Sequence, residues 1–195
     1  KFFVRGLRND SGRARQLSAT GYVEWVMGDL RAKTGMHIIT ETDPVTGALF
    51  ARNAYNTEFA ERIAFFDVDD DARVLTADRR EFIPDAMSRF RLSGRIGSGL
   101  DPCGALQVPF TLADGEEREI IFRLGVAGRQ NADQQSLVRR FAEAGSVIRR
   151  FRGSFAARIA LEGVHRYWRE ALGAVQVQTP DVALNILSNG WLVYQ

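Results

Sequence analysis

Hydrophobic and polar residues alternate along the first two-thirds of the chain, and this period of two predicts β-strands. Residues 16–28 (QLSATGYVEWVMG) show the pattern at its greatest length. One face of this strand would carry Leu17, Ala19, Gly21, Val23 and Trp25. The other face would carry Ser18, Thr20, Tyr22 and Glu24. The pattern predicts a strand that buries one side only.

Turn residues divide the remaining alternating runs. Two extended runs within residues 37–55 surround the segment 43–47 (DPVTG), whose proline and glycine predict a hairpin. Further strands are predicted at 62–68 (RIAFFDV), 105–112 (ALQVPFTL) and 117–126 (EREIIFRLGV). Asp114-Gly115 suggests a second hairpin between the last two, with or without Glu116 in its loop. Many short strands joined by turns predict a mainly β fold, an antiparallel β-sandwich.

The last third of the chain changes to a helical period. Asp133 can cap a helix through 134–144, and Ser154 can cap a second helix that ends at Gly173. The apolar stripe of the second helix would be Phe155, Ile159, Val164, Tyr167, Trp168 and Ala171. Residues 174–178 (AVQVQ) predict a short strand. After it, Thr179 as cap and Pro180 in the first turn predict a third helix.

The two ends of the chain suggest a piece of a longer polypeptide. Lys1 is followed at once by an apolar run, and the last predicted helix ends on residues 191–195 (WLVYQ) without a stop signal. An apolar last turn requires a covering surface.

Composition and charge narrow the class of protein. Hydrophobic residues make up 45% and charged residues 26%, as in ordinary globular proteins. The 26 basic and 24 acidic residues nearly cancel, so no general attraction to nucleic acid is expected. A single cysteine excludes an internal disulfide and fits a reducing compartment. Since no apolar run reaches the ~18 residues of a membrane span, we expect a cytoplasmic segment.

Residues 94–104 (GRIGSGLDPCG) could form either a phosphate-binding loop or a simple turn. Phosphate loops place their glycines between a strand and a helix. Here a strand pattern follows, the spacing of Gly94, Gly97 and Gly99 misses the dinucleotide fingerprint, and no lysine-serine or lysine-threonine pair follows the glycines. We therefore predict a loop-and-turn role.

Two charged stretches could indicate a calcium-binding loop and a nucleic-acid-binding segment. Asp67, Asp69, Asp71 and Asp78 occupy calcium-loop positions one, three, five and twelve, but Ala72 stands where such a loop needs glycine. We expect a solvated acidic loop.

The repeated VRRF (138–141) and IRRF (148–151) would bind nucleic acid only if their aromatic rings were exposed beside the arginines. In a helix, Phe141 is expected to face a core.

The sequence shows no catalytic or metal-binding set. His37 and His165 fall in different predicted elements, without a partner at metal-ligand spacing. A sugar epimerase built on a sandwich would need a converging acid and base, and no such pair is visible. No catalytic residue, metal ligand or cofactor site is predicted.

Seven segments in this order resemble a known family. They are residues 14–29, 46–56, 62–70, 76–82, 92–125, 150–153 and 172–195. Together they resemble the phosphorylases of glycoside hydrolase family 94, formerly glycosyltransferase family 36. Within it, the likeness points to the C-terminal phosphorylase-like region of cyclic β-1,2-glucan synthases.

The resemblance implies a domain organisation. Residues 1–128 would be the later part of an N-terminal β-sandwich of the galactose mutarotase-like supersandwich type. Residues 129–173 would form a helical linker, and 174–195 the first, truncated part of an (α/α)₆ barrel. The family's catalytic aspartate and phosphate-binding residues belong to that barrel, so this chain alone is expected to be inactive.

The resemblance also implies partners for the parent enzyme. These are glucan oligosaccharides, inorganic phosphate as co-substrate, the barrel of the same polypeptide, a second copy in a homodimer, and membrane anchoring through other regions. Alternatives are a stand-alone β-1,2-oligoglucan or cellobiose phosphorylase, and a carbohydrate-binding module. The module would require exposed rings for sugar stacking, for which Tyr22, Trp25 and Tyr55 are the candidates.

Overall fold

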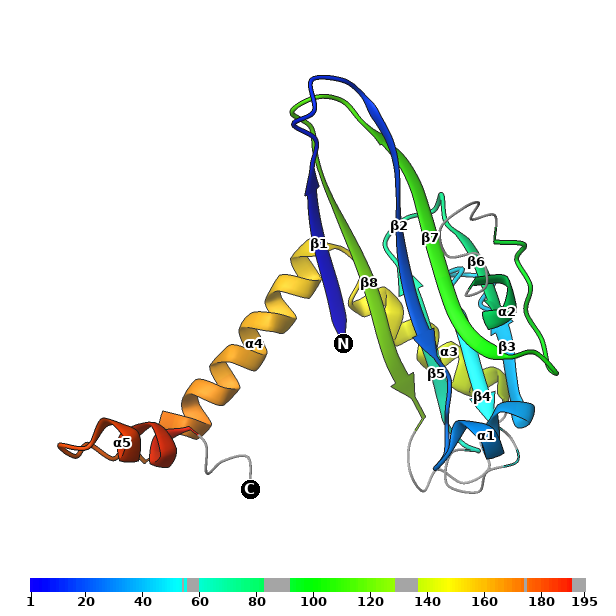
Figure 1. The fold of residues 1–195 in the computed structure, drawn as a ribbon. Helices are drawn as coiled ribbons and strands as arrows, with labels where there is room; N and C mark the ends of the chain where they lie inside the picture. Colours follow the sequence, from blue (N-terminus) through cyan, green and yellow to red (C-terminus); the bar gives the residue numbers. More distant parts are fainter. Residues whose placement is uncertain (54, 56–59, 83–91, 129–136, 174, 191–195) are drawn as a thin grey trace. The chain divides into compact units, whose positions relative to one another are not determined.

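The computed structural model describes residues 1–53, 55, 60–82, 92–128, 137–173 and 175–190 (Figure 1). Its described strands form two antiparallel sheets, which confirms the mainly β sandwich. The five-stranded sheet has the order β1 (Phe2–Arg8), β8 (Glu117–Ala127), β5 (Ile63–Val68), β4 (Leu49–Asn53), β3 (Ile38–Thr42). The three-stranded sheet has the order β2 (Arg15–Glu24), β7 (Pro102–Leu112), β6 (Val74–Asp78).

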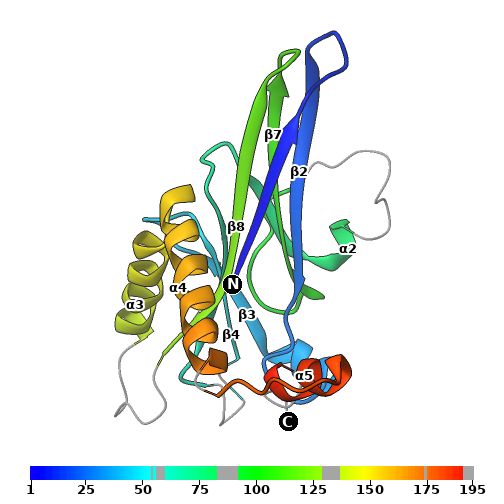
Figure 2. The same ribbon diagram turned by 90° about the vertical axis from the view of Figure 1, so that its left-hand side faces the viewer.

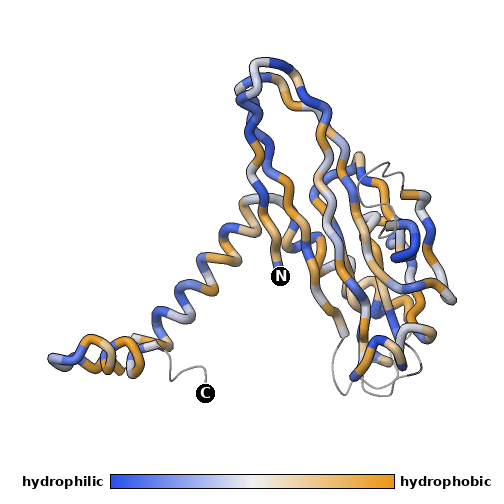
Figure 3. The backbone as a smooth tube through the Cα atoms, in the orientation of Figure 1, coloured by the Kyte–Doolittle hydropathy of each residue, from blue (hydrophilic) through white to orange (hydrophobic). Residues whose placement is uncertain are grey.

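The main core lies between the inner faces of the two sheets. Alternate residues of β7 and β8, among them Leu106, Val108 and Phe122, meet there and are almost completely buried. β2 contributes Ala19 and Val23 from its predicted apolar face. Leu17, from the same face, remains 40% exposed. Figure 3 shows apolar and polar segments following one another along these strands.

The connection at 113–116 joins the two sheets, so the predicted hairpin there is wrong. β7 pairs with β2 and β8 pairs with β1, while the preceding connection, 9–14, makes the same crossing (Figure 1). Asn9 joins the two connections, because its side-chain amide donates to the carbonyl oxygens of Arg13, Leu112 and Ala113 at 2.8–3.0 Å. The turn signal was correct, but β7 and β8 do not pair with each other, and their partners β2 and β1 lie about 80 to 120 residues away in sequence. The hairpin predicted at 43–47 is confirmed by the pairing of β3 with β4.

A helix covers the outer face of the five-stranded sheet. α3 (Leu137–Arg150) buries Ala144 and Ile148 against Phe50 and Phe65, and the ring of Phe141 stacks on that of Phe50 at 5.4 Å (Figure 2). The prediction that Phe141 faces a core is therefore confirmed. The cap predicted at Asp133 lies outside the described residues. Short helices α1 (Arg31–Thr34), η1 (Gly35–His37) and α2 (Arg79–Phe82) complete this part of the chain.

The chain divides into two compact units, Lys1–Gly153 and Ser154–Gln195. The second unit holds α4 (Ser154–Gly173) and α5 (Val182–Asn189). Residues 175–178 form no strand, so that prediction is wrong. Asp181, not Thr179, caps α5, because its side chain accepts from the backbone N–H groups of Ala183 and Leu184. Pro180 thus precedes the cap, and the predicted apolar end at 191–195 lies outside the described residues.

The predicted apolar stripe of α4 is exposed. Exposed fractions run from 43% to 77% for Phe155, Ile159, Val164, Tyr167 and Trp168. No helix among the described residues has the length and hydropathy to cross a membrane.

Candidate functional site

The three candidate sugar-binding rings do not form an exposed row. Trp25 is 4% exposed, and its indole N–H donates to the carbonyl oxygen of Cys103 at 2.8 Å. A ring buried in the core has no face for a sugar. Alternation assigned Trp25 to the inward face, and the residue is buried in the core although β2 ends one position earlier, at Glu24. Tyr22 is half-buried, and Tyr55 is 77% exposed with its ring stacked on His37 at 4.2 Å. No observation here favours a carbohydrate-binding module.

Tyr22 belongs to a polar cluster at one end of β2. Its hydroxyl donates to Glu24 at 2.8 Å, and burial together with this bond raises the pKa of Tyr22. The hydroxyl bond and the nearby guanidinium groups of Arg31 and Arg79 lower the pKa of Glu24. Both arginines also pair with Asp101. These pairs attach α1 and α2 to the start of β7.

A cavity of about 200 Å³ is lined by residues of β1 and β2, each of which is one edge strand of its sheet. Its floor is made by Phe66 and Phe122, and its polar lining includes Arg5 and Tyr22. Among the described residues, no aspartate or glutamate lines it. Acid catalysis needs a proton donor within hydrogen-bond reach of the substrate, and this cavity offers no carboxyl group for that role.

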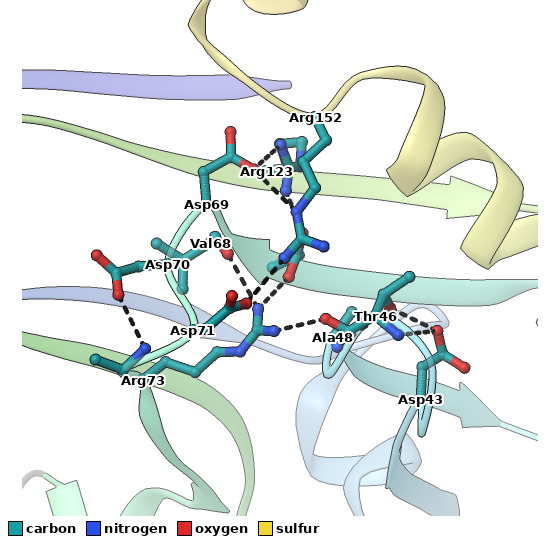
Figure 4. A network of polar contacts seen from close by, with 12 residues as sticks. Asp43, Thr46, Ala48, Val68, Asp69, Asp70, Asp71, Arg73, Arg123 and Arg152 are labelled. Carbon is teal, nitrogen blue, oxygen red and sulfur yellow. Dashed lines mark hydrogen bonds and ion pairs between the residues drawn. The ribbon is translucent and has the colours of Figure 1, made fainter.

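The aspartates of residues 67–71 are bound by arginines and not solvated, except at Asp71. Asp67 has a side-chain exposure of 0%, and its carboxylate pairs with Arg123 and, at 2.6 Å, with Arg73. Figure 4 shows Arg73, Arg123 and Asp69 in this network of polar contacts. Arg73 also donates to the carbonyl oxygen of Thr46. Asp71 is 96% exposed at the side chain. The expectation of a solvated acidic loop is wrong for the rest of this run.

A second layer of the same network surrounds Asp69. Its carboxylate lies 2.5 Å from a guanidinium nitrogen of Arg123 and 3.6 Å from Nε of Arg152. Its neighbour Asp70 pairs with Arg118. The carboxylate oxygens that a calcium ion would need are thus occupied by guanidinium groups. Sequence reasoning missed this network, because its arginines lie up to 83 residues from the acidic run and carry no local signal.

The glycine-rich segment forms a loop followed by a strand, which confirms its loop-and-turn role. Gly94, Gly97 and Gly99 have φ values of 78°, 128° and 72°, in the left-handed region that favours glycine. Backbone bonds hold the loop on both sides, from Thr40 N–H to the Gly97 carbonyl and from Ala77 N–H to the Arg95 carbonyl. Arg95 also pairs at 3.0 Å with Asp78, whose side chain is 1% exposed.

The histidines and the remaining carboxylates do not converge on a metal site. His37 lies in η1 and His165 in α4, in different compact units. Over the described ranges, no group of three or more histidine, cysteine, aspartate or glutamate residues has metal-binding geometry.

Comparison with known proteins identifies the family. Residues 4–144 match the model of the glycosyl hydrolase 94 supersandwich domain. This chain belongs to that family. The match includes both sheets and the first part of α3.

Three relatives show the range of the similarity. The cyclic beta-(1,2)-glucan synthase NdvB of Rhizobium meliloti is 37% identical over 97% of this chain and 7% of the relative. The N,N'-diacetylchitobiose phosphorylase of Vibrio furnissii is 28% identical over 97% of this chain and 24% of the relative. A 3-O-beta-D-glucopyranosyl-beta-D-glucuronide phosphorylase of Paenibacillus borealis is 29% identical over 58% of this chain and 13% of the relative. The chain thus spans a quarter or less of the length of each.

The resemblance inferred from sequence is confirmed at the level of family and fold. The assignment of 129–173 to a linker and of 174–195 to a barrel helix stays a prediction. α3 lies inside the predicted linker range, and it packs on the five-stranded sheet within the first compact unit.

Proposed function

We propose that this chain is the non-catalytic sandwich of a phosphorylase-type enzyme that processes β-1,2-linked glucan. In the whole enzyme it would support the catalytic barrel and the contact between two copies. Glucan and inorganic phosphate would then be substrates of the whole enzyme, at a site formed by other parts of the polypeptide. The placement on the cytoplasmic side and anchoring through other regions belong to the same proposal.

The observation that carries this proposal is that the buried carboxylates are paired with arginines inside the protein and are closed to a substrate. Asp67 and Asp78, with side chains 0–1% exposed, are both paired with arginine. A general acid for glycosidic cleavage must reach the leaving oxygen of the sugar. A bound sugar could reach neither the carboxyl group of Asp67 nor that of Asp78. Membership of the supersandwich family and the names of the relatives support the substrate class.

The test is an assay for phosphorolysis by the isolated chain. We expect no glucose 1-phosphate after incubation with β-1,2-glucooligosaccharides, or with cellobiose, in the presence of inorganic phosphate. Consumption of inorganic phosphate is measured in parallel, because the positive control, the Vibrio furnissii phosphorylase with N,N'-diacetylchitobiose, would release an N-acetylglucosamine phosphate and not glucose 1-phosphate. Sugar phosphate that forms in proportion to the concentration of this chain would overturn the proposal.

A further inference from the structure

The end of the first compact unit is held by several polar contacts and by one ring contact, that of Phe151 with Phe2 of β1 at 5.9 Å. α3 ends at Arg150, and the three residues Phe151–Gly153 follow before α4 begins at Ser154. Arg123 donates to the carbonyl oxygen of Phe151 at 3.1 Å. The backbone N–H of Gly153 donates to Asp69 Oδ2 at 2.9 Å. All three junction residues therefore have a contact within the network, since Arg152 pairs with Asp69 as well (Figure 4).

The residues that hold the junction, Asp69 and Arg123, belong to buried parts of the sandwich. Asp69 follows β5, whose residues are all buried, and its backbone N–H donates to the carbonyl oxygen of Ile121 in β8 at 3.0 Å. Arg123, also in β8, is 2% exposed. The junction is thus bound to the two strands at the centre of the five-stranded sheet.

We infer that Asp69 is a lock for this junction, which can open while the sheets and α3 stay folded. α3 has its own apolar contacts through Phe141, Ala144 and Ile148, so it does not depend on Asp69 to stay on the sheet. The lock is polar and reaches water, because the side chains of Asp69 and Arg152 are 15% and 37% exposed. Segments with few buried apolar contacts open locally, at a lower free energy than global unfolding.

The lock determines where the chain leaves the first unit. Gly153 has a φ of 91°, and Ser154 begins α4 directly after it. When Asp69 holds the Gly153 amide, the starting point of α4 is fixed to the central strands. When the lock opens, Gly153 loses its hydrogen bond to Asp69, while Phe151 keeps its contacts with Arg123 and with the ring of Phe2. This inference is independent of the proposed function, because it concerns a local opening that any parent protein would share.

Amide hydrogen exchange measured by NMR on the full chain tests the lock. We expect Asp69→Ala to accelerate exchange of the Gly153 amide at least tenfold more than exchange of the β5–β8 ladder amides, whose rates follow the stability of the whole sandwich. Asp70→Ala is the matched control, because Asp70 lies on the same turn and pairs with Arg118, away from the junction. Equal acceleration at Gly153 and in the ladder, or an equal effect of Asp70→Ala at Gly153, would overturn the inference.

If Asp69→Ala does not fold, amide exchange of the unmodified chain at increasing urea concentrations tests the same inference. Local opening exposes little surface, so its rate is insensitive to low concentrations of urea. We expect Gly153 to be protected from exchange, with a rate that stays constant as urea is added while the ladder amides accelerate. An unprotected Gly153, or a Gly153 rate that rises in parallel with the ladder, would overturn the inference.

Discussion

Arg123 is held inside the protein by two carboxylates and one carbonyl oxygen. Its guanidinium lies between Asp67 and Asp69 and reaches Phe151, with a side-chain exposure of 2%. Taking a charge out of water costs several kcal/mol, which only close partners of opposite charge can offset. The arrangement is therefore stable as a set, and each member depends on the others.

Removal of Arg123 alone should destabilise the fold strongly. We expect Arg123→Met to lower the free energy of unfolding by about 3–5 kcal/mol, because Asp67 would keep a buried charge and lose one of its two arginines. Urea unfolding followed by circular dichroism measures the change. Arg8→Met is the control, since Arg8 pairs with Asp10 and Glu117 at the surface, and its midpoint should not move. Equal effects of the two substitutions would contradict the role assigned to burial.

At the scale of elements, β2 approaches the five-stranded sheet closely because of Gly21. A Cβ atom at this position would lie 2.6 Å from the Phe122 ring and 2.7 Å from the Phe66 ring. These two rings stack on each other at 5.9 Å and are almost completely buried. The absence of a side chain at Gly21 thus lets the edge of one sheet close over the aromatic core of the other.

A methyl group at position 21 should push the sheets apart. We expect Gly21→Ala to cost about 1–3 kcal/mol of unfolding free energy, the usual range for overpacking a core. Gly6→Ala is the matched control in the neighbouring edge strand β1, because nothing lies within 4 Å of its Cβ position. Thermal unfolding compares the two variants. If Gly21→Ala is as stable as Gly6→Ala, the close approach of β2 does not contribute as described.

At the scale of the whole molecule, the pKa of the Cys103 thiol differs between the folded and the unfolded chain. Cys103 is completely buried in β7, next to the indole of Trp25. Burial, with repulsion from Asp78 and Asp101, raises the pKa of the thiol from 9.0 to about 12. The thiol becomes as acidic as an ordinary cysteine only when the sandwich opens.

Stability should therefore fall as the pH rises above about 9. Between the unfolded pKa of 9.0 and the folded pKa of about 12, the folded chain keeps a proton that the unfolded chain loses. The contribution of this proton is complete below pH 9 and decreases by at most about 1.4 kcal/mol per pH unit. Urea unfolding from pH 8 to 11 gives the slope, and Cys103→Ala should show a shallower one. The raised pKa of Tyr22 acts in the same direction in both proteins, so identical slopes would contradict the prediction for Cys103.

The alternation of apolar and polar residues predicted the positions of several strands but not how the strands pair. The runs at 16–28, 62–68, 105–112 and 117–126 coincide with β2, β5, β7 and β8 over most of their length, although β2 ends at Glu24, and the 43–47 turn joins β3 to β4. Alternation also assigned Trp25 to the inward face, where it is buried. The same pattern could not show that β7 and β8 belong to different sheets, because a four-residue turn serves both arrangements. The β1–β8 and β2–β7 pairings depend on residues about 80 to 120 positions apart.

The sequence by itself determined the positions of most strands and of the three longer helices, the apolar faces of those elements, and the family to which the chain belongs; β1, β6 and the short helices were not predicted. These properties depend on neighbouring residues or on the order of segments along the chain. Only the tertiary structure decided the pairing of the strands, the burial of Asp67 and Asp78, and the attachment of Gly153 to Asp69. A charge is solvated or buried according to what folds over it. The arginines that bind these aspartates come from β8, from the connections before β6 and β7, and from the residues after α3.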